Sequence, residues 1–263
     1  MSTPPTIDLT EFAQRLPEHA RPAFIEGRRS ALAGDGLTPE ERDVRRAEEA
    51  EARARQAREE LLTERAARRW AMWCHQVPAI YRDDRADCDQ REPHDFAWWL
   101  SRLHADQHAD KIAAWLGDPA AKTLWLVGDT GNGKTHAAIS AGYAAAARAV
   151  HARYISQLEY LRLLRPGGSD APQRERDRYA GTSLLILDDL GAETGDASQF
   201  VRQELLTLLD ERLSEGRRQI ITTNTPAEVL AETFGDRIMS RLRADAAVIK
   251  FTGPDRRTAR VPW

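Results

Sequence analysis

The sequence predicts an α/β fold, in which a parallel sheet is flanked by helices and follows a mainly helical N-terminal region. After residue 122, short apolar runs alternate with helical patterns, as in a parallel sheet with helices on both faces. Before residue 95, long stretches consist of strong helix formers. We therefore divide the 263 residues into a helical region (1–94), a linker helix (95–121) and an α/β domain (122–263).

The composition argues against several classes of protein. The first ten residues lack the apolar core of a signal peptide, and no stretch approaches the roughly 20 apolar residues of a membrane span. Two cysteines make no disulfide framework, so we expect a cytoplasmic protein without membrane contact. The net charge of −3 argues against bulk nonspecific affinity for nucleic acids but allows a local basic patch.

The N-terminal region centres on a charged helix. Thr38 is a predicted N-cap, and residues 40–70 are almost entirely Glu, Arg and Ala, with opposite charges at helical spacing such as Glu49 and Arg53. Two interpretations remain open: a solvated single helix, or a partner-binding helix or hairpin. In the second, four apolar residues supply its hydrophobic end: Leu61, Leu62, Trp70 and Trp73.

The next segment joins this helix to the α/β domain. Residues 71–93, which contain Pro78 and Pro93, are expected to be irregular. A helix is predicted over 95–115, and Gly117 begins the turn that ends it.

Within the α/β domain the expected elements follow in alternation. The predicted strands cover 123–127, 152–155, 184–187, 219–223 and 247–251. The predicted helices cover 134–149, 157–164, 198–214 and 235–243.

The first predicted strand leads into a P-loop, Gly-x-x-x-x-Gly-Lys-Thr. Its glycines let backbone N–H groups wrap phosphates at a helix N-terminus, Lys134 can reach the β- and γ-phosphates, and the Thr135 hydroxyl can ligate Mg²⁺. The loop therefore predicts ATP and Mg²⁺ as cofactors. The expected nucleotide contacts are Gly128, Asp129, Thr130, Gly131, Asn132, Gly133, Lys134 and Thr135.

Two further strand ends carry polar residues. The strand 184–187 ends in Asp188 and Asp189, the Walker B pattern: the first carboxylate would hold Mg²⁺ and the second would polarise the attacking water. Asp189 stands where a longer Glu is usual, which makes its reach shorter. Asn224 ends the strand 219–223, where it would lie beside the γ-phosphate.

Arg237 and Arg241 lie four residues apart on one predicted helix. An arginine placed against the γ-phosphate stabilises the charge that develops during hydrolysis, and from a neighbouring subunit it would make activity depend on assembly. A solvated basic face is the alternative.

Taken together, five segments resemble the DnaC/DnaI-type helicase loaders and the related IstB-type transposition ATPases, which have the AAA+ P-loop fold. The segments are Gly-Lys-Thr-His (133–136), Tyr-Ile-Ser (154–156), Leu-Leu-Ile-Leu-Asp-Asp-Leu-Gly-Ala-Glu (184–193), Thr-Thr-Asn (222–224) and Ser-Arg-Leu (240–242). The resemblance covers roughly residues 95–257.

Several residue roles follow from this resemblance alone. His136 belongs to the nucleotide-binding motif, Asn224 is similar to sensor 1, and Arg241 resembles the arginine finger, with Arg237 a second candidate. Arg257 aligns with the sensor 2 arginine, although Asp255 replaces the serine of that pattern.

The resemblance also implies partners. It predicts slow, partner-stimulated ATP hydrolysis, ATP-dependent self-association, and delivery of a DnaB-type replicative helicase onto single-stranded DNA. The DNA-contacting insertion would lie between Gln157 and Tyr179. That stretch offers cationic and stacking groups, namely Arg162, Arg165, Arg174, Arg176 and Arg178, with Tyr160 and Tyr179.

Two alternative functions stay open. An IstB-type transposition helper ATPase would carry a transposase-contacting module at its N-terminus, and a nucleotide-gated DNA-binding adaptor would hydrolyse little ATP.

Some relatives bind zinc in the N-terminal part, and here Cys74, His75, Cys88 and His94 form a possible ligand set without the compact spacing of a zinc knuckle.

Overall fold

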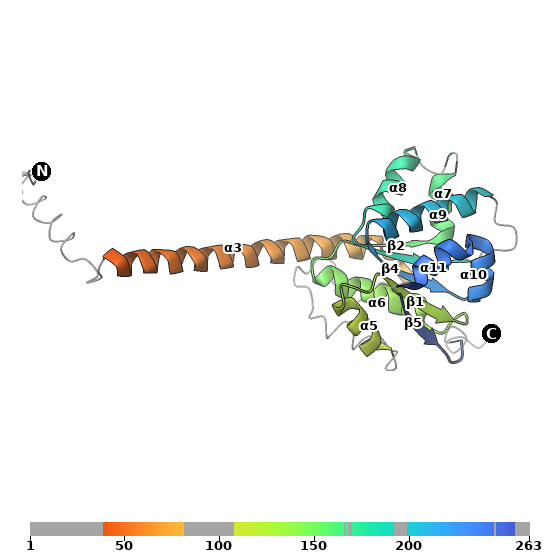
Figure 1. Ribbon diagram of the computed structural model, residues 1–263, viewed down its shortest axis with the longest axis horizontal. Helices are drawn as coiled ribbons and strands as arrows, with labels where there is room; N and C mark the ends of the chain where they lie inside the picture. Colours follow the sequence, from red (N-terminus) through yellow and green to blue (C-terminus); the bar gives the residue numbers. More distant parts are fainter. Residues whose placement is uncertain are drawn as a thin grey trace, which may run out of the picture. The chain divides into compact units, whose positions relative to one another are not determined.

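The computed structural model describes residues 39–81, 108–165, 167, 170–191, 199–244 and 246–255 (Figure 1). Contacts within the chain separate residues 1–59 from residues 60–263. The sequence predictions for residues 1–38 and for the segment 95–107 lie outside the described residues.

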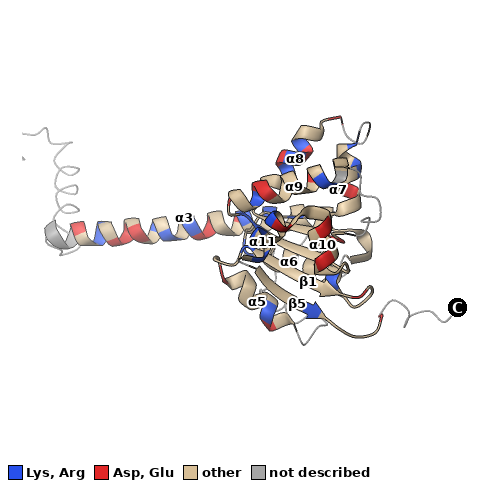
Figure 2. Cartoon of the chain, turned by 45° about the vertical axis from the view of Figure 1, so that its right-hand side comes forward, with Lys and Arg blue, Asp and Glu red and all other residues tan. Residues whose placement is uncertain are grey.

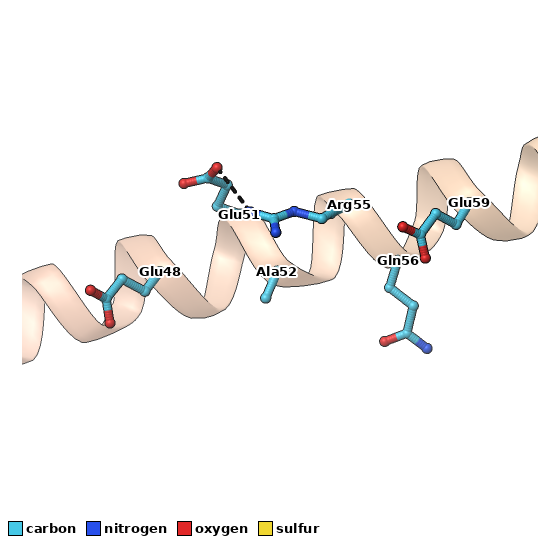
Figure 3. Close-up of a pocket in the computed structure, with 6 residues that line it drawn as sticks. All are labelled: Glu48, Glu51, Ala52, Arg55, Gln56 and Glu59. Carbon is cyan, nitrogen blue, oxygen red and sulfur yellow. Dashed lines mark hydrogen bonds and ion pairs between the residues drawn. The ribbon is translucent and has the colours of Figure 1, made fainter.

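Helix α3 (Pro39–Gln76) begins in the first of these units. Acidic and basic residues alternate along it (Figure 2), and residues 43–59 are all exposed. Ion pairs one turn apart, such as Arg45 with Glu49 (3.1 Å) and Arg55 with Glu51 (3.3 Å), stabilise this solvated part of the helix. Figure 3 shows an open pocket on one face of this stretch, lined by Glu48, Glu51, Ala52, Arg55, Gln56 and Glu59.

The last turns of α3 are buried in the second unit. Trp70 and Trp73 pack against Tyr143 of α6 (Lys134–Ala147), with ring centroids 5.3 and 5.9 Å apart. The prediction of an irregular segment from residue 71 is therefore wrong up to Gln76, because these apolar side chains find a helix partner. A short 3₁₀ helix, η1 (Ala79–Tyr81), follows.

The sheet contains five parallel strands in the order β2-β3-β4-β1-β5. The strands confirm the five predicted runs, each extended by one residue. They are β1 (Thr123–Gly128), β2 (Ala152–Ser156), β3 (Leu184–Asp188), β4 (Arg218–Thr223) and β5 (Ala246–Phe251).

Helices cover both faces of the sheet, as predicted. One face packs against the end of α3, α5 (Ala109–Gly117) and α6. The other packs against α7 (Gln157–Leu164), α8 (Pro172–Ala180), α9 (Gln199–Ser214), α10 (Ala227–Phe234) and α11 (Asp236–Ala244). Alternate strand residues serve the two cores: Leu124 and Leu126 face the first, and Trp125 faces the second.

A buried arginine ties the helices of the second face to the sheet. The side chain of Arg212, on α9, donates to the carbonyl oxygens of Tyr179 (2.7 Å), Ala180 and Thr182, and to that of Arg218 at the start of β4. Burial lowers the pKa of Arg212 to about 9. Within the described residues, no helix combines the length and apolar character that crossing a membrane requires.

Candidate nucleotide-binding site

The predicted site residues meet at one edge of the sheet. The chain leaves β1 into the P-loop, β3 ends at Asp188, and β4 leads to Asn224. Since all strands are parallel and β1 and β3 both pair with β4, these carboxyl ends lie side by side. Ligands of open α/β sheets bind at such an edge.

The P-loop backbone has the conformation that phosphate wrapping requires. Gly133 has a φ of 99° and is the N-cap of α6, so the helix dipole points into the loop. Gly128 has a φ of 147°, and a Cβ there would lie 2.2 Å from the carbonyl oxygen of Phe251. A larger residue at position 128 would therefore separate the loop from β5.

The side chain of Lys134, the first residue of α6, folds back into the P-loop. Its Nζ donates to the carbonyl oxygens of Gly128 (2.9 Å) and Asp129 (2.7 Å), and approaches Asn132 Oδ1 at 3.4 Å. The buried side chain of Asn132 in turn donates to the carbonyl oxygen of Phe251 at 3.0 Å. These contacts hold the ammonium group of Lys134 inside the P-loop, within reach of a phosphate that binds there.

Three hydroxyl groups surround the carboxylate of Asp188. Thr135 and Thr222 donate to Oδ1 at 2.9 and 2.6 Å, and Tyr154 donates to Oδ2 at 2.8 Å. A carboxylate and a threonine hydroxyl in direct contact are hard oxygen donors of the kind that Mg²⁺ takes from proteins, so the donor set fits this ion.

The turn that carries Asp189 is held on several sides. Asp189 is exposed and has a φ of 56°, a left-handed conformation that a non-glycine residue adopts only when its surroundings impose it. Its N–H donates to Thr222 Oγ1 at 2.9 Å, and the N–H of Leu190 donates to the carbonyl oxygen of Thr222 at 2.9 Å. These two hydrogen bonds fix the backbone of the turn at the edge of the sheet.

Asn224 lies beside the P-loop. Its Nδ2 donates to Thr130 Oγ1 at 3.3 Å, which joins the end of β4 to the loop that follows β1. The structure thus brings together the P-loop, the two aspartates and this amide.

A family model, described as IstB-like ATP binding protein, matches residues 42–254 of the chain. The chain belongs to this IstB-like family. The membership makes it a nucleotide-binding protein, and the sheet with its P-loop is the AAA+ fold of that family.

Curated and solved proteins similar to this IstB-like chain include replication initiators. Over 141 residues it is 32% identical to the chromosomal replication initiator protein DnaA of Sphingopyxis alaskensis, covering 51% of this chain but only 30% of that relative's length. The crystal structure of DnaI matches with 27% identity and a TM-score of 0.50, over 60% of this chain and 89% of DnaI. A structure of DnaA bound to AMPPCP and single-stranded DNA shares the fold, at 18% identity and a TM-score of 0.50, over 59% of this chain and 50% of DnaA.

In this IstB-like chain, the other residues predicted to bind the nucleotide or support hydrolysis lie in separate places. Arg241 forms an ion pair with Asp210 of α9 and donates to Ser214 at 3.3 Å. Arg237 is exposed, and no ion pair joins it to any part of the chain that the structure describes. His136 is also exposed on the first turn of α6, and Arg257 lies outside the described residues.

One prediction about the insertion is wrong. Tyr160 and Tyr179 are 1% and 7% exposed and pack edge to face, with ring centroids 5.8 Å apart, so neither can stack on a base. Arg176 is paired with Glu204 of α9 at 2.7 Å. Exposed cationic groups remain on α7, on α8 and after α7: Arg162, Arg165, Arg174 and Arg178.

The possible zinc set is only partly described. Cys74 is 1% exposed and belongs to the core beneath α6, while Cys88 and His94 lie outside the described residues. Within the described part of the chain, His, Cys, Asp and Glu form no group of three or more that could hold a metal ion.

Sequence reasoning missed three residues of the site. Tyr154 and Thr222 bind Asp188, and the side-chain oxygen of the buried Gln157 accepts a hydrogen bond from the N–H of Gly191. Two of them lie within the Tyr-Ile-Ser and Thr-Thr-Asn segments, but only strand pairing shows what they contact.

Proposed function

We propose that this chain is an ATPase that hydrolyses ATP to ADP and phosphate with Mg²⁺. Thr135 and Asp188 would hold the ion, whose chemistry is to neutralise charge on the β- and γ-phosphates. Lys134 would bind the same phosphates, and Asp189 would orient the attacking water with the help of Asn224. The observation that carries this proposal is the contact of the Asp188 carboxylate with Thr135, because it joins the P-loop to the second strand end.

The proposed biological role is that of a helicase loader in the cytoplasm, which delivers a DnaB-type replicative helicase onto single-stranded DNA. Similarity to DnaI over 89% of that chain supports this role. The exposed part of α3 suits protein docking better than DNA binding, because its acidic and basic residues largely cancel in charge. The four exposed arginines of the α7–α8 segment would contact the DNA backbone.

Nucleotide state would control assembly. Arg237 is the better placed of the two arginines to act on a neighbouring subunit, since it is exposed whereas Arg241 is paired with Asp210. An arginine supplied by the next subunit would make hydrolysis depend on an ATP-dependent oligomer.

The test is a pull-down with the replicative helicase of the same host, in ATP and in ADP. Full-length protein is compared with a form that lacks residues 1–59, whose removal leaves the buried end of α3 in place. Retention of the helicase only with ATP and only by the full-length chain is the expected result. Thermal melting and ATP binding of both forms verify that each is folded.

An IstB-type transposition helper is the second candidate, because the matching family model is described as IstB-like ATP binding protein. Absence of helicase binding under every nucleotide, with folded and ATP-competent protein, would move this role to first place. Turnover with and without single-stranded DNA separates both from an adaptor that hydrolyses little ATP.

A further inference from the structure

Tyr154 contacts the metal-binding end of the site from a neighbouring strand. It lies on β2, two residues before Ser156, which pairs with Asp188 across the strands. Side chains two residues apart on a strand share a face, so the phenol runs along the sheet toward this carboxylate. Its hydroxyl donates to Asp188 Oδ2 at 2.8 Å, and Asp188 is only 3% exposed.

The three hydroxyl contacts leave one acceptor direction on Asp188. An ionised carboxylate offers about four lone-pair sites, two on each oxygen. Thr135 and Thr222 take both sites on Oδ1, and Tyr154 takes one on Oδ2. The remaining site is therefore on Oδ2, next to the Tyr154 hydroxyl.

We propose that Tyr154 is a positioning residue for Asp188: its hydroxyl fixes the orientation of the carboxylate that, together with Thr135, would hold Mg²⁺. This inference rests on the proposed ATPase function. Without the phenol, the Oδ2 side of the carboxylate loses its anchor and can turn away from the ion. Groups that orient a metal ligand in this way typically contribute about 10- to 100-fold to metal affinity.

The experiment compares Tyr154→Phe with Tyr160→Phe, which removes a hydroxyl from a tyrosine of the opposite core. Binding of a fluorescent ATP analogue is titrated in EDTA and at increasing Mg²⁺, and thermal melting without nucleotide checks the fold. We expect equal affinity in EDTA for all three proteins. The Mg²⁺ concentration for half-maximal effect should rise about tenfold in Tyr154→Phe alone.

An unchanged Mg²⁺ dependence in Tyr154→Phe overturns the inference, and so does weaker binding in EDTA, which would indicate a damaged loop. A wild-type protein that binds the analogue without any effect of Mg²⁺ instead refutes the proposed ATPase site, and this inference with it.

Discussion

The side-chain oxygen of Gln157 accepts a hydrogen bond of 2.8 Å from the backbone N–H of Gly191. Gln157 is the first residue of α7, and Gly191 lies two residues beyond Asp189. The bond therefore ties the helix that begins the proposed DNA-contacting segment to the turn that presents the proposed water-orienting carboxylate. Gln157 is 3% exposed, so water does not compete for this N–H.

Replacing Gln157 with Met removes the hydrogen-bond acceptor and leaves a side chain of similar size. We expect this change to weaken the effect of DNA on ATP hydrolysis. We expect stimulation of turnover by single-stranded DNA to fall several-fold, with ATP affinity unchanged, because Asp189 loses one support of its turn. An unpaired buried N–H also costs about 1–3 kcal/mol of stability. Gln157→Glu keeps an acceptor oxygen and is the matched control; equal stimulation in both variants would refute the coupling.

Asp189→Asn should reduce turnover about 100-fold, the lower end of the contribution of a positioned general base, and leave ATP binding intact. Asp189→Glu adds the methylene that the usual Walker B pattern has, and should raise basal turnover. The rate of phosphate release, measured with saturating ATP and Mg²⁺, distinguishes the two variants from each other and from the wild type. If the Asn variant turns over at the wild-type rate, Asp189 has no part in the hydrolysis.

The Gly142→Ala substitution tests the packing of α3 against α6. An added Cβ would lie 2.0 Å from Cζ2 of Trp73, so one helix must shift. We expect a loss of about 1–3 kcal/mol in the free energy of unfolding, measured by urea denaturation, as in other overpacked cores. Gly117→Ala, where nothing lies within 4 Å of the new atom, is the control and should not destabilise. Similar losses in both would mean that Trp73 is not the cause.

His151 predicts an acid-sensitive fold. Burial first, and then the charges of Arg69, Arg153 and Arg178, lower its pKa to about 4 in the folded state, against about 6.5 when unfolded. Between these values the unfolded chain binds a proton that the folded chain does not, so stability is complete above pH 6.5 and declines toward pH 4. Melting temperatures of His151→Gln should depend less on pH over this interval than those of the wild type or of His75→Gln, an exposed control.

Arg237→Ala should lower turnover only where subunits assemble. The loss is expected at high protein concentration, with unchanged ATP binding by dilute protein, because the exposed guanidinium would act on the neighbour's nucleotide. Arg241→Ala removes a partly exposed ion pair with Asp210, which is worth little in stability. A turnover loss confined to Arg241→Ala would reverse the assignment of the two residues.

The strands and the P-loop were predictable from the sequence because their signals are local. Each strand is a short apolar run, and the loop is a contiguous motif. The contacts of Tyr154, Thr222 and Gln157 were not predictable, since they depend on which strand lies beside β3 and in what register.

Three other features were not predicted from the sequence: the burial of Tyr160 and the helices α8 and α10. The pattern of α7 does contain the signal for burial of Tyr160, because Gln157, Leu161 and Leu164 lie on the same helical face and are also buried. Helix α8 was not predicted because its Arg-rich sequence has no apolar repeat, and α10 was not predicted because its eight residues show only a short one.

The packing of Trp70 and Trp73 on α6 gives the two ends of that helix different tasks. Its first residue is Lys134, and its later turns receive the tryptophans that end α3. Substitutions in the core beneath these rings can therefore displace the helix that begins with Lys134.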